Sequence, residues 1–129
     1  MGEKDLVDDM GLELHWNPGD LTVRWARGGH TIVKEFADPP RSAIYVREPA
    51  SVVIVESMES AGALNAVVYE LDGRERLRLQ PLPVDSPIGF DQVFESRAGL
   101  VAVFATRRGD IQGVPDLTDG ELRELREWR

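Results

Sequence analysis

The feature that most constrains this chain is a series of short apolar runs, separated by turn residues, that begins at Leu12. The runs recur every ~8–12 residues, which is the spacing of antiparallel strands joined by tight turns. Apolar and polar residues alternate most clearly in Leu21–Trp25 and Glu75–Gln80. Such alternation is typical of strands that bury one face and expose the other. We therefore predict an all-β chain.

Turn signals such as Asn17-Pro18-Gly19-Asp20 and Asp72-Gly73 separate the runs. No long amphipathic pattern precedes residue 117, which favours sequential hairpins over βαβ units. The predicted fold is an antiparallel meander of about ten short strands, open or barrel-like, with strands at these runs: Leu12–Trp16, Leu21–Trp25, Thr31–Phe36, Ala43–Arg47, Ser51–Ser57, Ala66–Leu71, Glu75–Gln80, Phe90–Glu95, Leu100–Thr106 and Ile111–Val114.

Two segments depart from this pattern. Residues 81–89 contain three prolines and are predicted to be irregular, because proline cannot donate to a sheet ladder. Residues 117–129 leave two alternatives open. Thr118-Asp119-Gly120-Glu121 matches a helical capping box, whereas Asp119-Gly120 alone is equally a hairpin turn. We favour a last strand over Leu122–Trp128, with a short C-terminal helix as the alternative.

The length and charge of the chain bound its organisation. Its 129 residues fit one domain that can fold without a metal or a disulfide. We assign residues 12–129 to a single all-β domain and residues 1–11 to an acidic N-terminus, which the usual behaviour of chain ends predicts to be disordered. The net charge is −8, and residues 1–20 carry six acids and one lysine. Binding to nucleic acid is disfavoured, because phosphate contacts need a basic stripe.

The sequence predicts a cytoplasmic protein. It contains no cysteine, which suits a reducing compartment. Residues 1–10 lack the basic start and apolar stretch of a signal peptide. No run approaches the ~18 apolar residues of a membrane-spanning helix, so a membrane partner is not expected.

A weak internal repeat relates two of the predicted hairpins. Residues 66–79 read as strand, Asp72-Gly73 turn and strand, and residues 111–125 repeat this plan around Asp119-Gly120. The first of these segments, residues 66–79, resembles the hairpins of quinoprotein-type (PQQ-like) propeller blades. Asp116-Leu-Thr-Asp-Gly-Glu resembles their Asp-x-x-Thr-Gly-Lys turn, with Asp and Glu in place of the Thr and the Lys. The chain is too short for the four blades of a closed propeller, so the resemblance implies blade-like hairpins in an open meander or in an oligomer.

The chain also resembles small uncharacterised bacterial proteins with an NxVxxxDxDGxxxW hairpin followed by a DxxTGK hairpin. Asn65, Val67, Asp72 and Gly73 match the first motif, and Leu77 stands near its aromatic position. The likeness spans residues 30–128 and implies a fold rather than an activity.

No catalytic set is predicted. His15 is expected on the polar face of a strand and His30 in a turn, and no serine lies in a Gly-x-Ser-x-Gly frame. No metal site and no cofactor are expected. Four carboxylates near strand ends are candidates for glycosidase-like chemistry, but any acidic β protein offers as many: Glu56, Glu59, Glu70 and Glu95.

The leading hypothesis is therefore a non-enzymatic interaction protein, immunity- or antitoxin-like, that binds a basic macromolecular partner. Its alternatives are a small-ligand-binding or scaffold β domain and, third, a carboxylate-dependent hydrolase. The oligomeric state is left open. The tryptophans, with Trp128 included, fit either a core or an interface. The candidate partner-binding residues are four acids and two tryptophans: Asp5, Asp8, Asp9, Glu13, Trp16 and Trp25.

Overall fold

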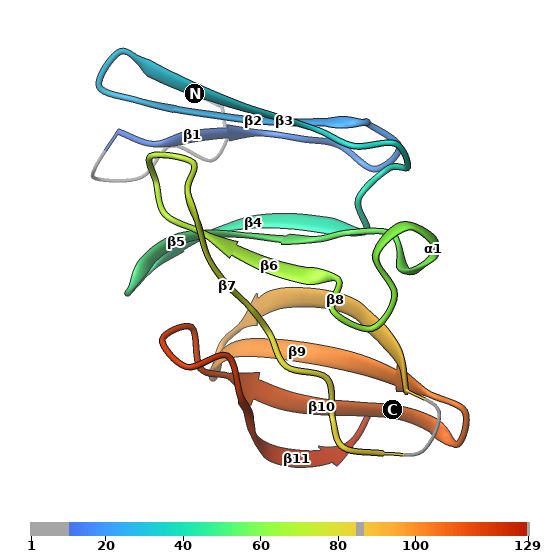
Figure 1. Ribbon diagram of the computed structural model, residues 1–129. Helices are drawn as coiled ribbons and strands as arrows, with labels where there is room; N and C mark the ends of the chain where they lie inside the picture. Colours follow the sequence, from blue (N-terminus) through green and yellow to red (C-terminus); the bar gives the residue numbers. More distant parts are fainter. Residues whose placement is uncertain (1–10, 85–86, 129) are drawn as a thin grey trace.

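The protein is a stack of three antiparallel β-sheets (Figure 1), seen in a computed structural model that describes residues 11–84 and 87–128. Strands that follow one another in sequence are neighbours within each sheet. The predicted antiparallel all-β meander is confirmed. It takes the open form, because no sheet closes into a barrel within these residues.

Sheet A is the first layer and contains β1 (Glu13–His15), β2 (Thr22–Arg27) and β3 (His30–Glu35). The β1–β2 turn closes with a hydrogen bond from the Asp20 amide to the Asn17 carbonyl at 2.9 Å. Between β2 and β3, Gly28 and Gly29 both have positive φ, which glycine adopts without strain. The Asn17-Pro18-Gly19-Asp20 signal read from the sequence therefore places the turn between β1 and β2 correctly.

Sheet B is the middle layer. Its strands are β4 (Ser42–Arg47), β5 (Ala50–Val55), β6 (Ala66–Tyr69) and β7 (Glu75–Arg78). The connection from β5 to β6 holds the one-turn helix α1 (Met58–Ala61), which the sequence did not predict. Ser57 caps this helix by accepting a hydrogen bond from the Glu59 amide at 3.2 Å.

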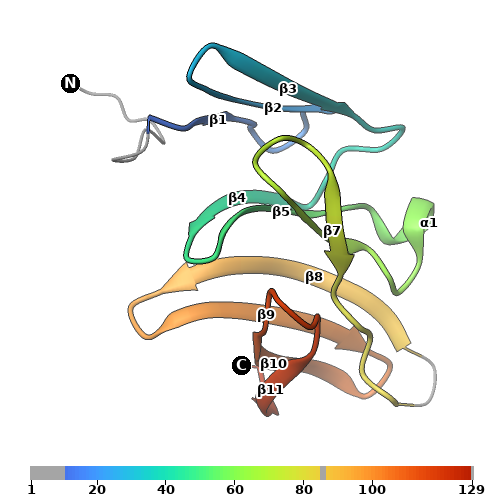
Figure 2. The same cartoon turned by 60° about the vertical axis from the view of Figure 1, so that its left-hand side comes forward.

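Sheet C is the last layer, with β8 (Pro87–Ser96), β9 (Gly99–Thr106), β10 (Gly109–Pro115) and β11 (Leu122–Glu127). Figure 2 shows the same three layers from another side. The strand prediction for the last segment is confirmed and the helical alternative is wrong, because residues 116–121 close the hairpin between β10 and β11.

The prediction that residues 81–89 are irregular is wrong for its last three residues. Pro87 opens β8 and pairs with Thr106. Because β8 is the edge strand of sheet C, one side of its backbone needs no ladder partner, and a proline is tolerated there.

Each interface between two sheets holds one apolar core. Trp25 and Tyr69 meet between sheets A and B, with ring centroids 5.9 Å apart. Phe90 and Phe104 meet between sheets B and C in an edge-to-face contact at 4.8 Å. Sheet B is therefore buried on both faces, which explains why Ser-Val-Val-Ile-Val at residues 51–55 is an unbroken buried run.

Two polar side chains tie the layers together. Asn65 is fully buried, and its Nδ2 donates to the carbonyls of Glu56 and Phe90, both at 2.8 Å. Its Oδ1 accepts from the Phe90 amide at 2.7 Å, so the side chain acts as a strand neighbour for the edge of β8. Between sheets A and B, the Trp25 Nε1 donates to the Leu71 carbonyl at 2.9 Å.

The two outer faces of the stack differ in polarity. Along β2, Arg24 alternates with the core residues Val23 and Trp25, and the outer face of sheet A is mostly polar. Along β8 and β9, the core residues Val93 and Ala102 alternate with Phe94 and Val101, which pair with each other on the outer face of sheet C. Sheet C therefore turns apolar side chains away from the core.

Candidate functional site

A backbone bulge sets the orientation of one arginine in sheet B. Val68 pairs with Leu77, whereas the next residue of β6, Tyr69, pairs with Glu75. Arg76 is therefore the extra residue on β7. A bulge of this kind re-aims a side chain, and here it lets the guanidinium reach back toward β5.

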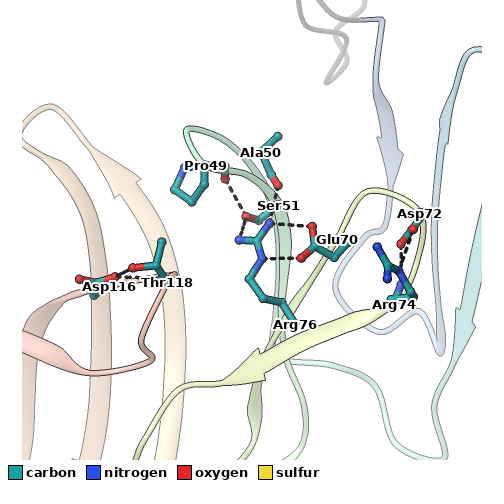
Figure 3. A network of polar contacts seen from close by, with 9 residues as sticks. All are labelled: Pro49, Ala50, Ser51, Glu70, Asp72, Arg74, Arg76, Asp116 and Thr118. Atoms are coloured by element: carbon teal, nitrogen blue, oxygen red, sulfur yellow. Dashed lines mark hydrogen bonds and ion pairs between the residues drawn. The ribbon is translucent and has the colours of Figure 1, made fainter.

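Arg76 clamps the hairpin between β4 and β5 (Figure 3). Its guanidinium donates to both carboxylate oxygens of Glu70 at 2.9 and 3.0 Å, to Ser51 Oγ at 2.8 Å and to the Ala50 carbonyl at 3.1 Å. The Ser51 hydroxyl in turn donates to the Pro49 carbonyl at 2.6 Å. These bonds fix the turn from which Glu48 projects.

The Glu70–Arg76 pair keeps both of its charges. Hydrogen bonds from Arg76 hold the pKa of Glu70 below its ordinary value, and those to Glu70 raise the pKa of Arg76. A general acid needs the opposite perturbation, a carboxyl whose pKa is raised toward neutrality. The pair is thus suited to holding the hairpin.

A second organised carboxylate closes the β10–β11 turn. Asp116 Oδ1 accepts from the Thr118 hydroxyl at 2.6 Å and from its amide at 2.9 Å, and Oδ2 accepts from Arg123 at 3.2 Å. The Thr118 bonds are the main reason that the pKa of Asp116 falls to about 2. Arg123 also contacts Asp119, so its charge is neutralised within the turn.

The tips of sheets B and C enclose a surface hollow, which we call the acidic hollow. Its volume is about 490 Å³, and it takes Glu48 from the β4–β5 turn, Glu95 from β8 and Glu124 from β11. All three residues are exposed, and none of their side chains has a hydrogen-bond or ion-pair partner among residues 11–84 and 87–128. Arg47 and the neutralised Arg123 also line it. The arrangement leaves the three carboxylates available to cationic groups.

Glu124 has an unusual backbone conformation. Its φ is 55°, in the left-handed region that most residues other than glycine avoid. It lies where the register of β10 and β11 shifts, between the Gln112–Arg126 and Val114–Arg123 pairs. Such a conformation costs about 1 kcal/mol or more, and residues that adopt it cluster at functional sites.

An apolar groove adjoins the acidic hollow on the outer face of sheet C. Its volume is about 570 Å³, and it shares Leu100, Val114 and Glu124 with the hollow. Phe94 and Trp128 form one part of its lining, in an edge-to-face contact at 5.8 Å. Val114 is 39% exposed and Leu125, also in the groove, is 49% exposed. The groove therefore offers accessible apolar surface beside unpaired carboxylates.

Those predicted partner-binding residues that the structure describes lie apart from the acidic hollow and the apolar groove. Asp5, Asp8 and Asp9 lie outside the described residues. Glu13 is exposed on sheet A, 3.4 Å from the His15 ring.

The two tryptophans of that prediction belong to sheet A and its turn. Trp16 is half-buried, donates to the Asp20 carbonyl at 3.1 Å and borders a separate hollow at the β1–β2 turn. Trp25 is 1% exposed, which leaves its indole no surface to offer a partner. His30 is exposed at the start of β3.

Sequence reasoning missed Glu48 and Glu124, and it singled out Glu95 only as a possible catalyst. Of the other strand-end carboxylates, Glu56 pairs with Arg78 at 3.1 Å and Glu70 with Arg76. One signal was present in the sequence, because Glu48 stands in the Pro-containing turn between two strands.

Among residues 11–84 and 87–128, no group of histidines and carboxylates is placed to hold a metal, and no helix has the length and apolarity to cross a membrane.

Comparisons with known proteins add no further relation. The likeness to quinoprotein-type blades thus rests on the two turn motifs. Comparison of the chain with models of protein families, with curated proteins and with solved structures gave no match.

Proposed function

We propose that this protein is a non-enzymatic interaction module that binds a basic protein partner through the acidic hollow. One observation carries the proposal: Glu48, Glu95 and Glu124 come from three different segments, line one hollow and have no cationic partner in the described part of the chain. A concrete form is an immunity- or antitoxin-like protein that masks a basic toxin by charge complementarity.

The overall charge supports this proposal. A net charge of −8 attracts a basic partner over a distance and speeds encounter, while unpaired carboxylates in a hollow give the complex its register. The left-handed backbone at Glu124 supports it further, because a glutamate there costs stability that a glycine would restore.

The carboxylates whose pKa is shifted give no support to a carboxylate-dependent hydrolase. The pKa values of Glu70, Asp72 and Asp116 are lowered, chiefly by hydrogen bonds from Arg76, Arg74 and Thr118 respectively. Acid catalysis by a carboxyl group instead requires burial or a neighbouring negative charge that raises its pKa.

The proposal is tested by titrating the protein with a synthetic peptide in which lysine alternates with glycine, using calorimetry at low salt. The variant Glu48→Gln, Glu95→Gln, Glu124→Gln should bind the peptide about tenfold more weakly, since each exposed pair contributes roughly 0.2–1 kcal/mol. The matched control is a second triple variant that removes three exposed carboxylates elsewhere: Glu35→Gln, Glu59→Gln and Glu75→Gln.

Equal weakening by the two triple variants would show that the peptide senses only net charge, and the acidic hollow would lose its role. A chain without residues 1–10 tests the remaining alternative, in which the N-terminal acids bind the partner. If that deletion alone abolishes binding, the partner surface lies at the N-terminal acids and the proposal for the hollow is wrong.

A further inference from the structure

The apolar groove lies on a sheet face that no described element covers. Sheet C is the last layer of the stack, and no described strand or helix lies beyond it (Figure 1). Phe94 and Val101 face outward here, because the residues before Phe94 and after Val101 belong to the core. Val114 extends the apolar lining, and Leu125 of the edge strand β11 borders the groove while its side chain packs beside Leu122 against Gly113.

The charges around the groove decide what can cover it. Glu124 lines both the groove and the acidic hollow, where Glu48 and Glu95 are also unpaired. A second copy packed on this face through a two-fold axis would bring a second set of these three carboxylates together with its Arg47 and Arg126, so attraction and repulsion would largely offset each other. A basic partner gains free energy from the same charges. Arg126 adds a single positive charge, two residues along β11 from Glu124.

We propose that the apolar groove and the acidic hollow form one binding surface, and that its partner is a basic protein surface from which an aromatic or long apolar side chain projects. The apolar side chain enters the groove beside Phe94 and Trp128, while neighbouring lysines or arginines reach Glu124 and the hollow. This inference rests on the proposed function and adds the apolar anchor to it. Buried apolar anchors supply much of the affinity at protein interfaces, and charges mainly supply orientation.

The test compares three peptides by NMR titration of the full chain labelled with ¹⁵N. The first is Lys-Gly-Lys-Gly-Trp-Gly-Lys-Gly-Lys, the second has Ser in place of Trp, and the third has Glu in place of every Lys. The Trp peptide should bind about tenfold more tightly than the Ser peptide, as expected for partial burial of an indole in an open groove. Its amide shift changes should include Phe94, Val101 and Leu125.

A pair of matched variants isolates the groove. Val114→Thr with Leu125→Gln should reduce affinity for the Trp peptide to that for the Ser peptide. The control, Val33→Thr with Leu21→Gln, makes the same exchanges at similarly exposed residues of β3 and of the turn before β2, 49% and 48% exposed, and should change neither affinity. Because Leu125 also contacts Gly113, the groove variant should lower the melting temperature somewhat, and affinities are compared at a temperature at which both variants remain folded.

The outcomes separate this inference from the proposed function. Equal affinity for the Trp and Ser peptides would overturn the apolar anchor while leaving the binding of basic partners intact. Failure of both lysine peptides to bind better than the Glu peptide would overturn the proposed function itself. Sedimentation that shows a dimer, abolished by Val114→Thr with Leu125→Gln, would mean that a second copy occupies the groove, contrary to the inference.

Discussion

Replacing Asn65 with alanine should weaken the attachment of sheet C to sheet B more than any exposed substitution. The side chain is fully buried and makes three hydrogen bonds, two of them to the backbone of Phe90 on β8. Alanine removes all three. The amide and carbonyl of Phe90 then lie in the interface without a partner.

The expected cost follows from those groups. A buried donor or acceptor left unsatisfied costs about 1–3 kcal/mol, and the two groups of Phe90 are buried, whereas water can reach the Glu56 carbonyl. We expect the free energy of unfolding to fall by about 3 kcal/mol, a large share of the roughly 5–15 kcal/mol typical of a domain. For a chain of this length, the melting temperature falls by about 10 °C.

Urea denaturation followed by tryptophan fluorescence measures this change, and the indole of Trp25 reports on the adjacent core. Asn17→Ala is the control, because Asn17 is exposed in the β1–β2 turn and the hydrogen bond that closes the turn uses its backbone carbonyl. A loss below about 1 kcal/mol for Asn65→Ala would refute the reasoning, since it would mean that water or a backbone shift satisfies both groups of Phe90.

Three further predictions concern local structure. Gly89→Ala should lower the free energy of unfolding by about 2 kcal/mol in urea denaturation, because φ is 148° and a Cβ would lie 2.8 Å from Met58 Cγ. Asp116→Asn should be less stable than the parent near neutral pH, and the difference should shrink as the pH falls from about 4 toward 2: the carboxylate, whose pKa is lowered to about 2, stabilises the fold above its unfolded pKa and loses this contribution as the pH falls through its folded pKa. Denaturation curves that differ equally near neutral pH and near pH 2 would contradict this. Glu124→Gly should raise stability by about 0.5–1 kcal/mol by relieving the left-handed backbone, while weakening binding of the lysine–glycine peptide in calorimetry.

The strands could be predicted because their signals are local. Alternation and turn chemistry act over a few residues, so the Asp72-Gly73 turn between β6 and β7 and the last hairpin were both found from sequence. The start of β8 at Pro87 was not, because a proline is tolerated there only by virtue of its place at a sheet edge, which depends on the whole sheet.

The candidate site could not be predicted for the same physical reason. Glu48 and Glu124 share a hollow only because sheet B packs on sheet C, and that packing depends on contacts distant in sequence such as Asn65 to Phe90. The left-handed conformation of Glu124 arises from a register shift between β10 and β11, which no local pattern of residues announces.

The burial of β5 on both faces has a consequence for aggregation. Residues 51–55 combine high β propensity with no charge and no proline, which is the composition of segments that form amyloid-like zippers. In the folded chain, β4 and β6 pair with both edges of β5, and sheets A and C cover its two faces. If sheet A separated from the stack before the rest unfolded, Val52 and Ile54 would become exposed. We therefore expect the Trp25–Leu71 hydrogen bond between sheets A and B to oppose self-assembly of this chain as well.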